Sequence, residues 1–264
     1  MTAVDFEGFV DRLAQASGET ILPFFRTRLG VEDKAAGHAT RKFDPVTEAD
    51  RAAETVMRHM IRTTFPQHGI IGEEFGSHAP DAEYVWVLDP IDGTRGFIAG
   101  VPMWGTLIGL LHKGVPSYGV MNQPFTRERF RGDGQSAYAV HDGGPARKLA
   151  TRACEELAQA TLMTTMPQLF KGRKHTLYQS VEKQARLTRY CADCYAFCMV
   201  ATGHVDIVIE TNLKPYDIVA LVPIIEGAGG VVTNWQGESP AKGGDIIACG
   251  DRALHQKVLE MLAG

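Results

Sequence analysis

The chain has 264 residues, of which 44% are hydrophobic and 22% charged, a composition ordinary for a soluble globular protein. Its formal net charge of −4 and the absence of a basic stripe argue against nucleic acid as a partner. No apolar run approaches the roughly 20 residues of a membrane span, and the first ten residues lack a signal-peptide core. We therefore expect a cytoplasmic protein that binds neither nucleic acid nor a membrane.

Two amphipathic helices are predicted at the start of the chain. Apolar residues recur at helical spacing over 5–25, and a polar loop over 31–45 separates this helix from a second one. The second helix begins at Thr47, a favourable N-cap, and Asp50 follows three residues later as in a capping box. Asp50 is therefore predicted to lie in the first helical turn, and Pro66 to mark the end.

A meander of strands is predicted next. The strands are expected at 70–71, 84–88, 104–112, 115–121, 126–131 and 135–140. Short glycine-containing turns such as 113–114 and 133–134 favour antiparallel hairpins. The first part of the chain is thus predicted to be two helices on a largely antiparallel sheet.

Strands and helices alternate after about residue 150, which is typical of a layered α/β unit. We expect strands at 161–165, 205–210, 230–234 and 246–249, and helices at 175–187, 192–202, 217–227 and 252–263. No Pro/Ser-rich linker separates the two patterns. We therefore predict two packed subdomains, an N-terminal α+β unit over 1–150 and a C-terminal α/β unit over 151–264.

The cysteines are Cys154, Cys191, Cys194, Cys198 and Cys249. An odd number without a signal peptide argues against a disulfide framework. Cys191, Cys194 and Cys198 suggest a metal site, but spacings of three and four place them on one face of the predicted helix. Cysteine packs there as a small apolar residue, so we favour core packing.

The segment 89–94, Asp-Pro-Ile-Asp-Gly-Thr, is the most informative in the chain. It follows the apolar strand 84–88, so two carboxylates are predicted in a tight turn just past a strand end. Carboxylate oxygens suit Mg²⁺, and backbone N–H groups at a helix start beside Gly93 suit a phosphate. The alternative is an ordinary turn, since Asp and Gly are common in turns.

Three further acidic residues, Asp50, Glu73 and Asp217, also lie at the edges of predicted elements. Taken singly, Asp50 and Asp217 could compensate helix dipoles, and Glu73 could lie in a solvated turn. Asp217 opens a strongly apolar helix after a buried strand that ends at Glu210. A carboxylate there, facing the acidic turn 89–94, would be repelled unless cations lie between them.

Several motifs resemble the inositol monophosphatase superfamily in order and spacing. They are 71–74 (Ile-Gly-Glu-Glu), 86–94, 216–217 (Tyr-Asp) and 227–230 (Gly-Ala-Gly-Gly). The sequence does not match two other phosphate-binding motifs. The haloacid dehalogenase pattern needs one residue fewer between its two Asp, and no P-loop occurs.

The wider context resembles the histidinol-phosphate phosphatase branch, through 44–50, 97–102, 193–195 and 213–217. One departure is Cys-Ala at 191–192, where that branch usually has small glycines. The resemblance implies an α/β fold, an αβαβα sandwich with an N-terminal largely antiparallel sheet and a C-terminal mixed sheet. It also implies a homodimer.

The resemblance further implies two or three Mg²⁺ ions per active site. Glu73, Asp89 and the Ile91 carbonyl would hold the first ion. Asp89, Asp92 and Asp217 would hold the second, so that Asp89 bridges the two. A weaker third ion would lie near Glu73 through waters. Paired ions make a nucleophile from water and stabilise the leaving alkoxide.

The catalytic residues implied by the resemblance are Asp50, Thr94 and Glu73. Asp50 and Thr94 would form a hydrogen-bonded pair that orients the attacking water. Asp92, with the backbone N–H groups of Gly93 and Thr94, would contact the substrate. For the lysine of the family's mobile loop, Lys34 corresponds best and Lys42 competes.

The resemblance also implies that Asp193 and Glu210 lie near the non-phosphate end of the substrate; the alternative is that they are ordinary surface or helix-cap acids. Two carboxylates suit the amine and imidazole of histidinol better than a neutral polyol. The predicted function is therefore hydrolysis of L-histidinol phosphate, a small phosphorylated metabolite, by direct attack of a metal-activated water. The alternatives are an inositol-1-phosphate or broad polyol phosphatase, and a regulatory binding protein of the same fold.

Overall fold

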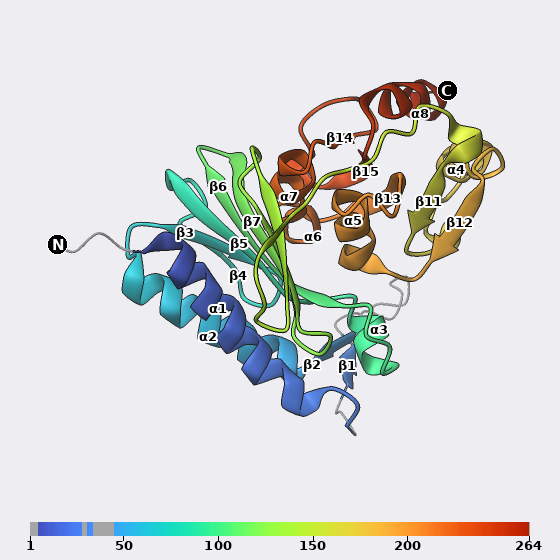
Figure 1. Ribbon diagram of the computed structural model, residues 1–264. Coiled ribbons are helices and arrows are strands. Elements are labelled where there is room, and N and C mark those ends of the chain that lie inside the picture. The colour runs from blue at the N-terminus through green and yellow to red at the C-terminus, as the bar shows by residue number, and fades with distance from the viewer. Residues whose placement is uncertain (1–4, 28–30, 34–44, 264) are drawn as a thin grey trace.

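The computed structural model describes residues 5–27, 31–33 and 45–263. Figure 1 shows the elements in layers: a helix pair, a large sheet, a central helix layer, a smaller sheet and outer helices. The predicted αβαβα sandwich is confirmed. Among the described residues, no helix is long and apolar enough to cross a bilayer.

The first layer consists of α1 (Phe6–Ile21) and α2 (Glu48–Thr64). Their apolar faces pack on the first sheet, where Leu13 and Met57 are fully buried. The capping box at the start of α2 is confirmed, since the Thr47 N–H donates to the Asp50 carboxylate over 2.8 Å. A 3₁₀ turn, Leu22–Phe24, continues α1, and the short strands β1 (Val31–Asp33) and β2 (Pro45–Thr47) pair before α2.

The first sheet has the order β10-β9-β8-β7-β6-β5-β3-β4. Every pairing in it is antiparallel except that of β3 with β5. The strands are β3 (Gly69–Gly72), β4 (Gly76–His78), β5 (Tyr84–Asp92), β6 (Gly105–His112), β7 (Val115–Gln123), β8 (Glu128–Gly132), β9 (Ala137–His141) and β10 (Arg147–Lys148). The largely antiparallel meander predicted from the sequence is confirmed.

The second sheet has the order β12-β11-β13-β15-β14 and is mixed. β11 runs parallel to β12 and β13, and β15 runs antiparallel to β13 and β14. The strands are β11 (Thr161–Thr164), β12 (Leu187–Tyr190), β13 (Ile207–Leu213), β14 (Val231–Asn234) and β15 (Gly244–Cys249). The two sheets fall on either side of residue 150, and the division into subdomains there remains a prediction.

Helices α5 (Asp193–Ala201) and α7 (Leu221–Gly227) lie between the sheets, and α4 (Arg173–Glu182) and α8 (Arg252–Ala263) cover the outer face of the second (Figure 1). A large apolar cluster joins residues of both sheets through α5 and α7. Close packing depends on Gly119 of β7, where a Cβ would lie 1.8 Å from the Ala220 carbonyl oxygen. The central helices therefore fix the two sheets against each other.

Two predicted helices have different bounds. The helix expected over 175–187 ends at Glu182, and Leu187 already begins β12. Good helix formers at 183–186 conceal this end in the sequence. The helix expected over 217–227 is two helices, α6 (Pro215–Ile218) and α7. Pro223 has no N–H for the Val219 carbonyl and would clash with it in one continuous helix.

The prediction that three cysteines share one helix face is wrong for Cys191. Cys194 and Cys198 lie in α5 and are buried in the apolar cluster between the sheets. Cys191 precedes the helix, is exposed, and has a φ of 65° that no right-handed helix accommodates. Core packing is thus confirmed for two of the three.

Candidate functional site

A cavity of about 520 Å³ is lined by residues from β5, α3 (Thr94–Ile98), the start of α5, β13 and α6. Six acidic side chains line it: Glu73, Asp89, Asp92, Asp193, Glu210 and Asp217. Ile91, Gly93 and Thr94 line it as well. The structure therefore brings together residues that are up to 144 positions apart in the sequence, from Glu73 to Asp217.

The end of β5 carries two of these acids. The predicted strand stopped at residue 88, but β5 continues to Asp92, with a shift of register between Asp89 and Asp92. Asp89 lies opposite Leu107 and Asp92 opposite Gly105, so β5 has one residue more than β6. This bulge, with Pro90 in it, turns both carboxylates toward the cavity. Asp89 accepts the Ile91 N–H over 3.0 Å.

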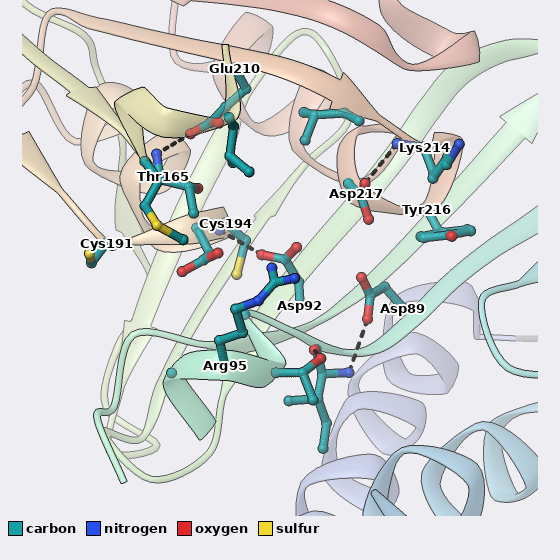
Figure 2. A pocket seen from close by; sticks show the side chains of 18 of the residues that line it. Asp89, Asp92, Arg95, Thr165, Cys191, Cys194, Glu210, Lys214, Tyr216 and Asp217 are labelled. Atoms are coloured by element: carbon teal, nitrogen blue, oxygen red, sulfur yellow. Dashed lines mark hydrogen bonds between the residues drawn. The ribbon is translucent and has the colours of Figure 1, made fainter. Parts of the chain in front are cut away.

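Asp217 reaches the same place from α6. Pro215 begins this short helix, and the Asp217 carboxylate accepts the Lys214 N–H over 2.7 Å. One carboxylate oxygen from each of Asp89, Asp92 and Asp217 lies within 4.8 Å of the others. Figure 2 shows the three side chains around one space.

The three carboxylates strongly disfavour one another's charge. Burial raises the pKa of Asp89 well above its usual value, and the neighbouring charges of Glu73, Asp92 and Asp217 raise it further. Burial also raises the pKa of Asp92, followed by repulsion from Asp193 and Asp217, and raises that of Asp217 to about 7. A hard divalent cation relieves such crowding, and an all-oxygen donor set suits Mg²⁺.

Glu73 lies immediately after β3, as predicted. Its N–H donates to the Leu88 carbonyl over 3.2 Å, which ties it to β5 beside Asp89. The Ile91 carbonyl accepts the Thr94 hydroxyl over 3.0 Å. These residues extend the set of oxygen donors around the three carboxylates.

Asp50 does not line the cavity. It is 1% exposed, and its carboxylate accepts both the N–H and the hydroxyl of Thr47, over 2.8 and 2.6 Å. The pairing of Asp50 with Thr94 therefore remains a prediction. Lys34 and Lys42, the two candidates for the mobile loop, lie outside the described residues.

Asp193 and Glu210 also line the cavity, and Figure 2 shows Glu210 beside Thr165, away from Asp217 of α6. β13 runs on to Leu213, so Glu210 lies within this strand and not at its end as predicted. The Glu210 carboxylate accepts the Thr165 N–H over 2.5 Å, and burial raises its pKa to about 8. Burial raises the pKa of Asp193 to about 6, while the charge of Arg95 acts in the opposite direction.

Several polar residues of the cavity were not predicted from the sequence, among them Arg95, Thr165 and Lys214. Arg95 directly follows the motif 89–94, so its position was a usable signal. Thr165 and Lys214 also line the cavity, and each donates its N–H to an acidic side chain. Nothing local in the sequence marks Thr165, because its contact depends on β11 lying beside β13.

The Cys194 N–H donates to the Asp92 carboxylate over 2.6 Å. This bond joins the start of α5 to the end of β5, so the second half of the chain helps to orient a residue of the first. Asp193, the preceding residue, has a φ of 41°. The left-handed backbone there places its side chain in the cavity wall.

Comparisons with known proteins agree with this geometry. A model of the inositol monophosphatase family matches residues 6–263. The chloroplastic bifunctional phosphatase IMPL2 of Arabidopsis thaliana is 42% identical over 97% of this chain and 75% of its own length. A histidinol-phosphatase of Chlorobaculum parvum is 33% identical over 94% of this chain and 92% of its own. The solved structure of an inositol monophosphatase from Zymomonas mobilis superposes with a TM-score of 0.86 and 39% identity, covering 100% of both chains.

Proposed function

The chain belongs to the inositol monophosphatase family, and from this premise we propose that it hydrolyses L-histidinol phosphate to L-histidinol and phosphate. The family is metal-dependent, typically with Mg²⁺, and acts on small phosphorylated substrates. The observation that supports the specific substrate is the pair of carboxylates, Asp193 half-buried and Glu210 buried, in the same cavity as the crowded acidic trio.

The proposed metal ligands are Asp89, Asp92 and Asp217, with Glu73 and the Ile91 carbonyl beside them. For the three Asp, the raised pKa values and the distances within 4.8 Å among their oxygens support this assignment. When bound, two or three Mg²⁺ ions would supply the charge that lowers the pKa of water and neutralises the phosphate. The bulge in β5 positions Asp89 and Asp92, and the Lys214 N–H positions Asp217, before any ion binds.

Asp50 and Thr94 are proposed to orient the attacking water. Asp50 is held in the first turn of α2 by Thr47, and the Thr94 side chain is held at the cavity by the Ile91 carbonyl. Orientation of a water by such residues contributes about 10²- to 10⁴-fold to catalysis. Because the attack is direct, configuration at phosphorus inverts and no phosphoenzyme forms.

The tail of the substrate is proposed to lie against Asp193 and Glu210. Burial raises the pKa of both, and the charge of Arg95 lowers that of Asp193. Burial disfavours the charged form of these carboxylates. Histidinol carries an ammonium group and an imidazole, so its tail supplies the nearby positive charge that favours their ionised form. A neutral polyol supplies only hydrogen bonds and does not offset the cost of ionising these carboxylates.

An inositol 1-phosphate or broad polyol phosphatase is the second candidate. It is favoured by the full-length match to the inositol monophosphatase of Zymomonas mobilis. Both candidates share the proposed metal ligands and differ only in the use of Asp193 and Glu210. We further propose a homodimer, which sedimentation equilibrium would test.

The experiment that tests the proposed reaction is phosphate release from L-histidinol phosphate, with and without Mg²⁺. We expect turnover only with Mg²⁺, and almost none in Asp89→Asn under the same conditions. Full turnover in excess chelator would contradict the metal assignment. Acid quench during turnover should trap no phosphorylated protein, and a trapped phosphoenzyme would contradict direct attack by water.

A further inference from the structure

Glu54 is a buried acid that lies outside the cavity. It is on α2, one helical turn after Asp50, and its exposed fraction is 0%. A buried carboxylate is costly unless it is paired and hydrogen-bonded. Its Oε1 accepts the Arg58 Nε–H over 2.7 Å, a pairing that supplies the opposite charge.

The remaining partners of Glu54 are backbone groups of one turn. Its Oε2 accepts the Glu74 N–H over 2.7 Å, and its Oε1 accepts the Phe75 N–H over 3.2 Å. This turn joins β3 to the edge strand β4, and Glu73 is its first residue. One carboxylate thus holds the two amides that directly follow Glu73.

Neighbouring residues extend this contact to both ends of the turn. A Cβ at Gly72 would lie 2.0 Å from the Glu54 Oε1, so a glycine is required for the carboxylate to approach β3. At the other end, Arg58 donates to the Gly76 carbonyl, where β4 begins. Glu54 and Arg58 therefore stabilise the turn from Gly72 to Gly76 by hydrogen bonds to its backbone.

We propose that Glu54 is a positioning residue for Glu73, with Arg58 as its counter-charge, and that it sets the affinity of the site for Mg²⁺. The proposal rests on the metal assignment made above. Glu73 is held from one side by its own N–H bond to Leu88 in β5. Glu54 holds the opposite side of the turn, so the Glu73 carboxylate is directed at the cavity before a cation arrives.

The test is Glu54→Gln with the whole chain, and the readout is the Mg²⁺ dissociation constant measured by calorimetry without substrate. Glutamine keeps the shape but replaces one acceptor oxygen by an NH₂ donor, which faces an amide N–H or the guanidinium. Loss of such a supporting partner typically weakens metal binding by about 10- to 100-fold. We expect a loss in that range.

Asp206→Asn is the matched control. Asp206 is 1% exposed, accepts two bonds from Arg152 and one from the Thr161 N–H, and does not line the cavity. It is therefore a buried acid with an arginine and an amide, like Glu54, but it directly precedes β13 of the second sheet, whereas the turn of Glu73 belongs to the first. We expect lower thermal stability and a Mg²⁺ dissociation constant within about twofold of the parent.

Weaker Mg²⁺ binding in Glu54→Gln but not in Asp206→Asn supports the proposal. An unchanged dissociation constant in Glu54→Gln, or equal weakening in both variants, overturns it. If Glu54→Gln does not fold, Arg58→Gln decides by the same criteria, because Arg58 is partly exposed and its loss removes the counter-charge. Asp89→Asn separates the premise from the inference: if it leaves Mg²⁺ binding intact, the metal assignment itself fails.

Discussion

The cavity has two acidic ends that differ in how their charges are arranged. At one end, Asp89, Asp92 and Asp217 offer oxygens within 4.8 Å of one another, and their mutual repulsion adds to the effect of burial on pKa. At the other end, burial is again the largest cause, the charge of Asp193 adds only a lesser rise to the pKa of Glu210, and Glu210 is held by a backbone amide. Crowded oxygens suit a compact divalent ion, whereas separately held carboxylates suit an organic cation.

The largest effect should come from the crowded end. Asp89→Asn removes the carboxylate that is proposed to bridge two ions, so kcat on any phosphate ester should fall by about 10³-fold or more. The metal-free variant should melt at the same temperature as the parent or higher, because one of the repelling charges is gone. Phosphate release and melting in chelator measure both. If Asp89→Asn were nearly as active as the parent, the crowded end would not be the metal site and would not differ in role from the other end.

A smaller loss of kcat is expected at Thr94 and Asp50, which are proposed to orient the attacking water and not to bind a metal. Thr94→Ala and Asp50→Asn should each lower kcat by about 10²-fold or more while the Mg²⁺ dissociation constant stays nearly the same. Residues that act as one unit are not additive, so the double variant should lose little more than either single one. If the two losses add fully in free energy, Asp50 and Thr94 act independently and the proposed pair is wrong.

The tail end should control specificity. Asp193→Asn or Glu210→Gln removes one charged contact to the substrate, which costs about 1.5–3 kcal/mol, or roughly 10- to 100-fold in KM for histidinol phosphate. A small neutral phosphate ester should be hydrolysed as before. Glu226→Gln, which removes an exposed charge that does not line the cavity, is the control. Equal losses on both substrates would mean that these carboxylates support the fold or the metal end.

The smallest effect concerns stability and pH. Burial raises the pKa of Glu210 from 4.5 to about 8, so the folded protein holds a proton that the unfolded chain has lost. Stability therefore falls as pH rises from about 4.5 to 8. Without metal or substrate, Glu210→Gln should melt at least about 3 °C above the parent at pH 8.5, and the difference should shrink toward pH 5. A constant difference across this range would show that Glu210 is already ionised.

The metal end was the more predictable part of the site. Segment 89–94 is contiguous and follows an apolar strand, so local sequence alone placed Asp89 and Asp92 near a strand end. Asp217 was found because it opens a strongly apolar helix directly after a buried strand and a proline turn, and because the motif 216–217 resembles the family. The bulge that turns both Asp residues inward could not be read from the sequence, since it depends on the register with β6.

Residues that act through partners distant in sequence were not predictable. Thr165 holds Glu210 only because β11 and β13 run side by side. Glu54 reads as an ordinary polar residue of an amphipathic helix, and only packing of α2 on the sheet shows that it accepts two amides of the Glu73 turn. The break between α6 and α7 was marked by Pro223, but the apolar run around it concealed the signal.

The two ends of the cavity are proposed to select different cations, a metal at the crowded end and the tail of histidinol at the other. The most direct test is the ratio of kcat/KM for L-histidinol phosphate to that for inositol 1-phosphate, measured on the parent protein at saturating Mg²⁺. The two charged contacts predict a preference for histidinol phosphate of about 10-fold or more. A ratio below one would contradict the role of Asp193 and Glu210 and leave an inositol or polyol phosphatase with the same metal end.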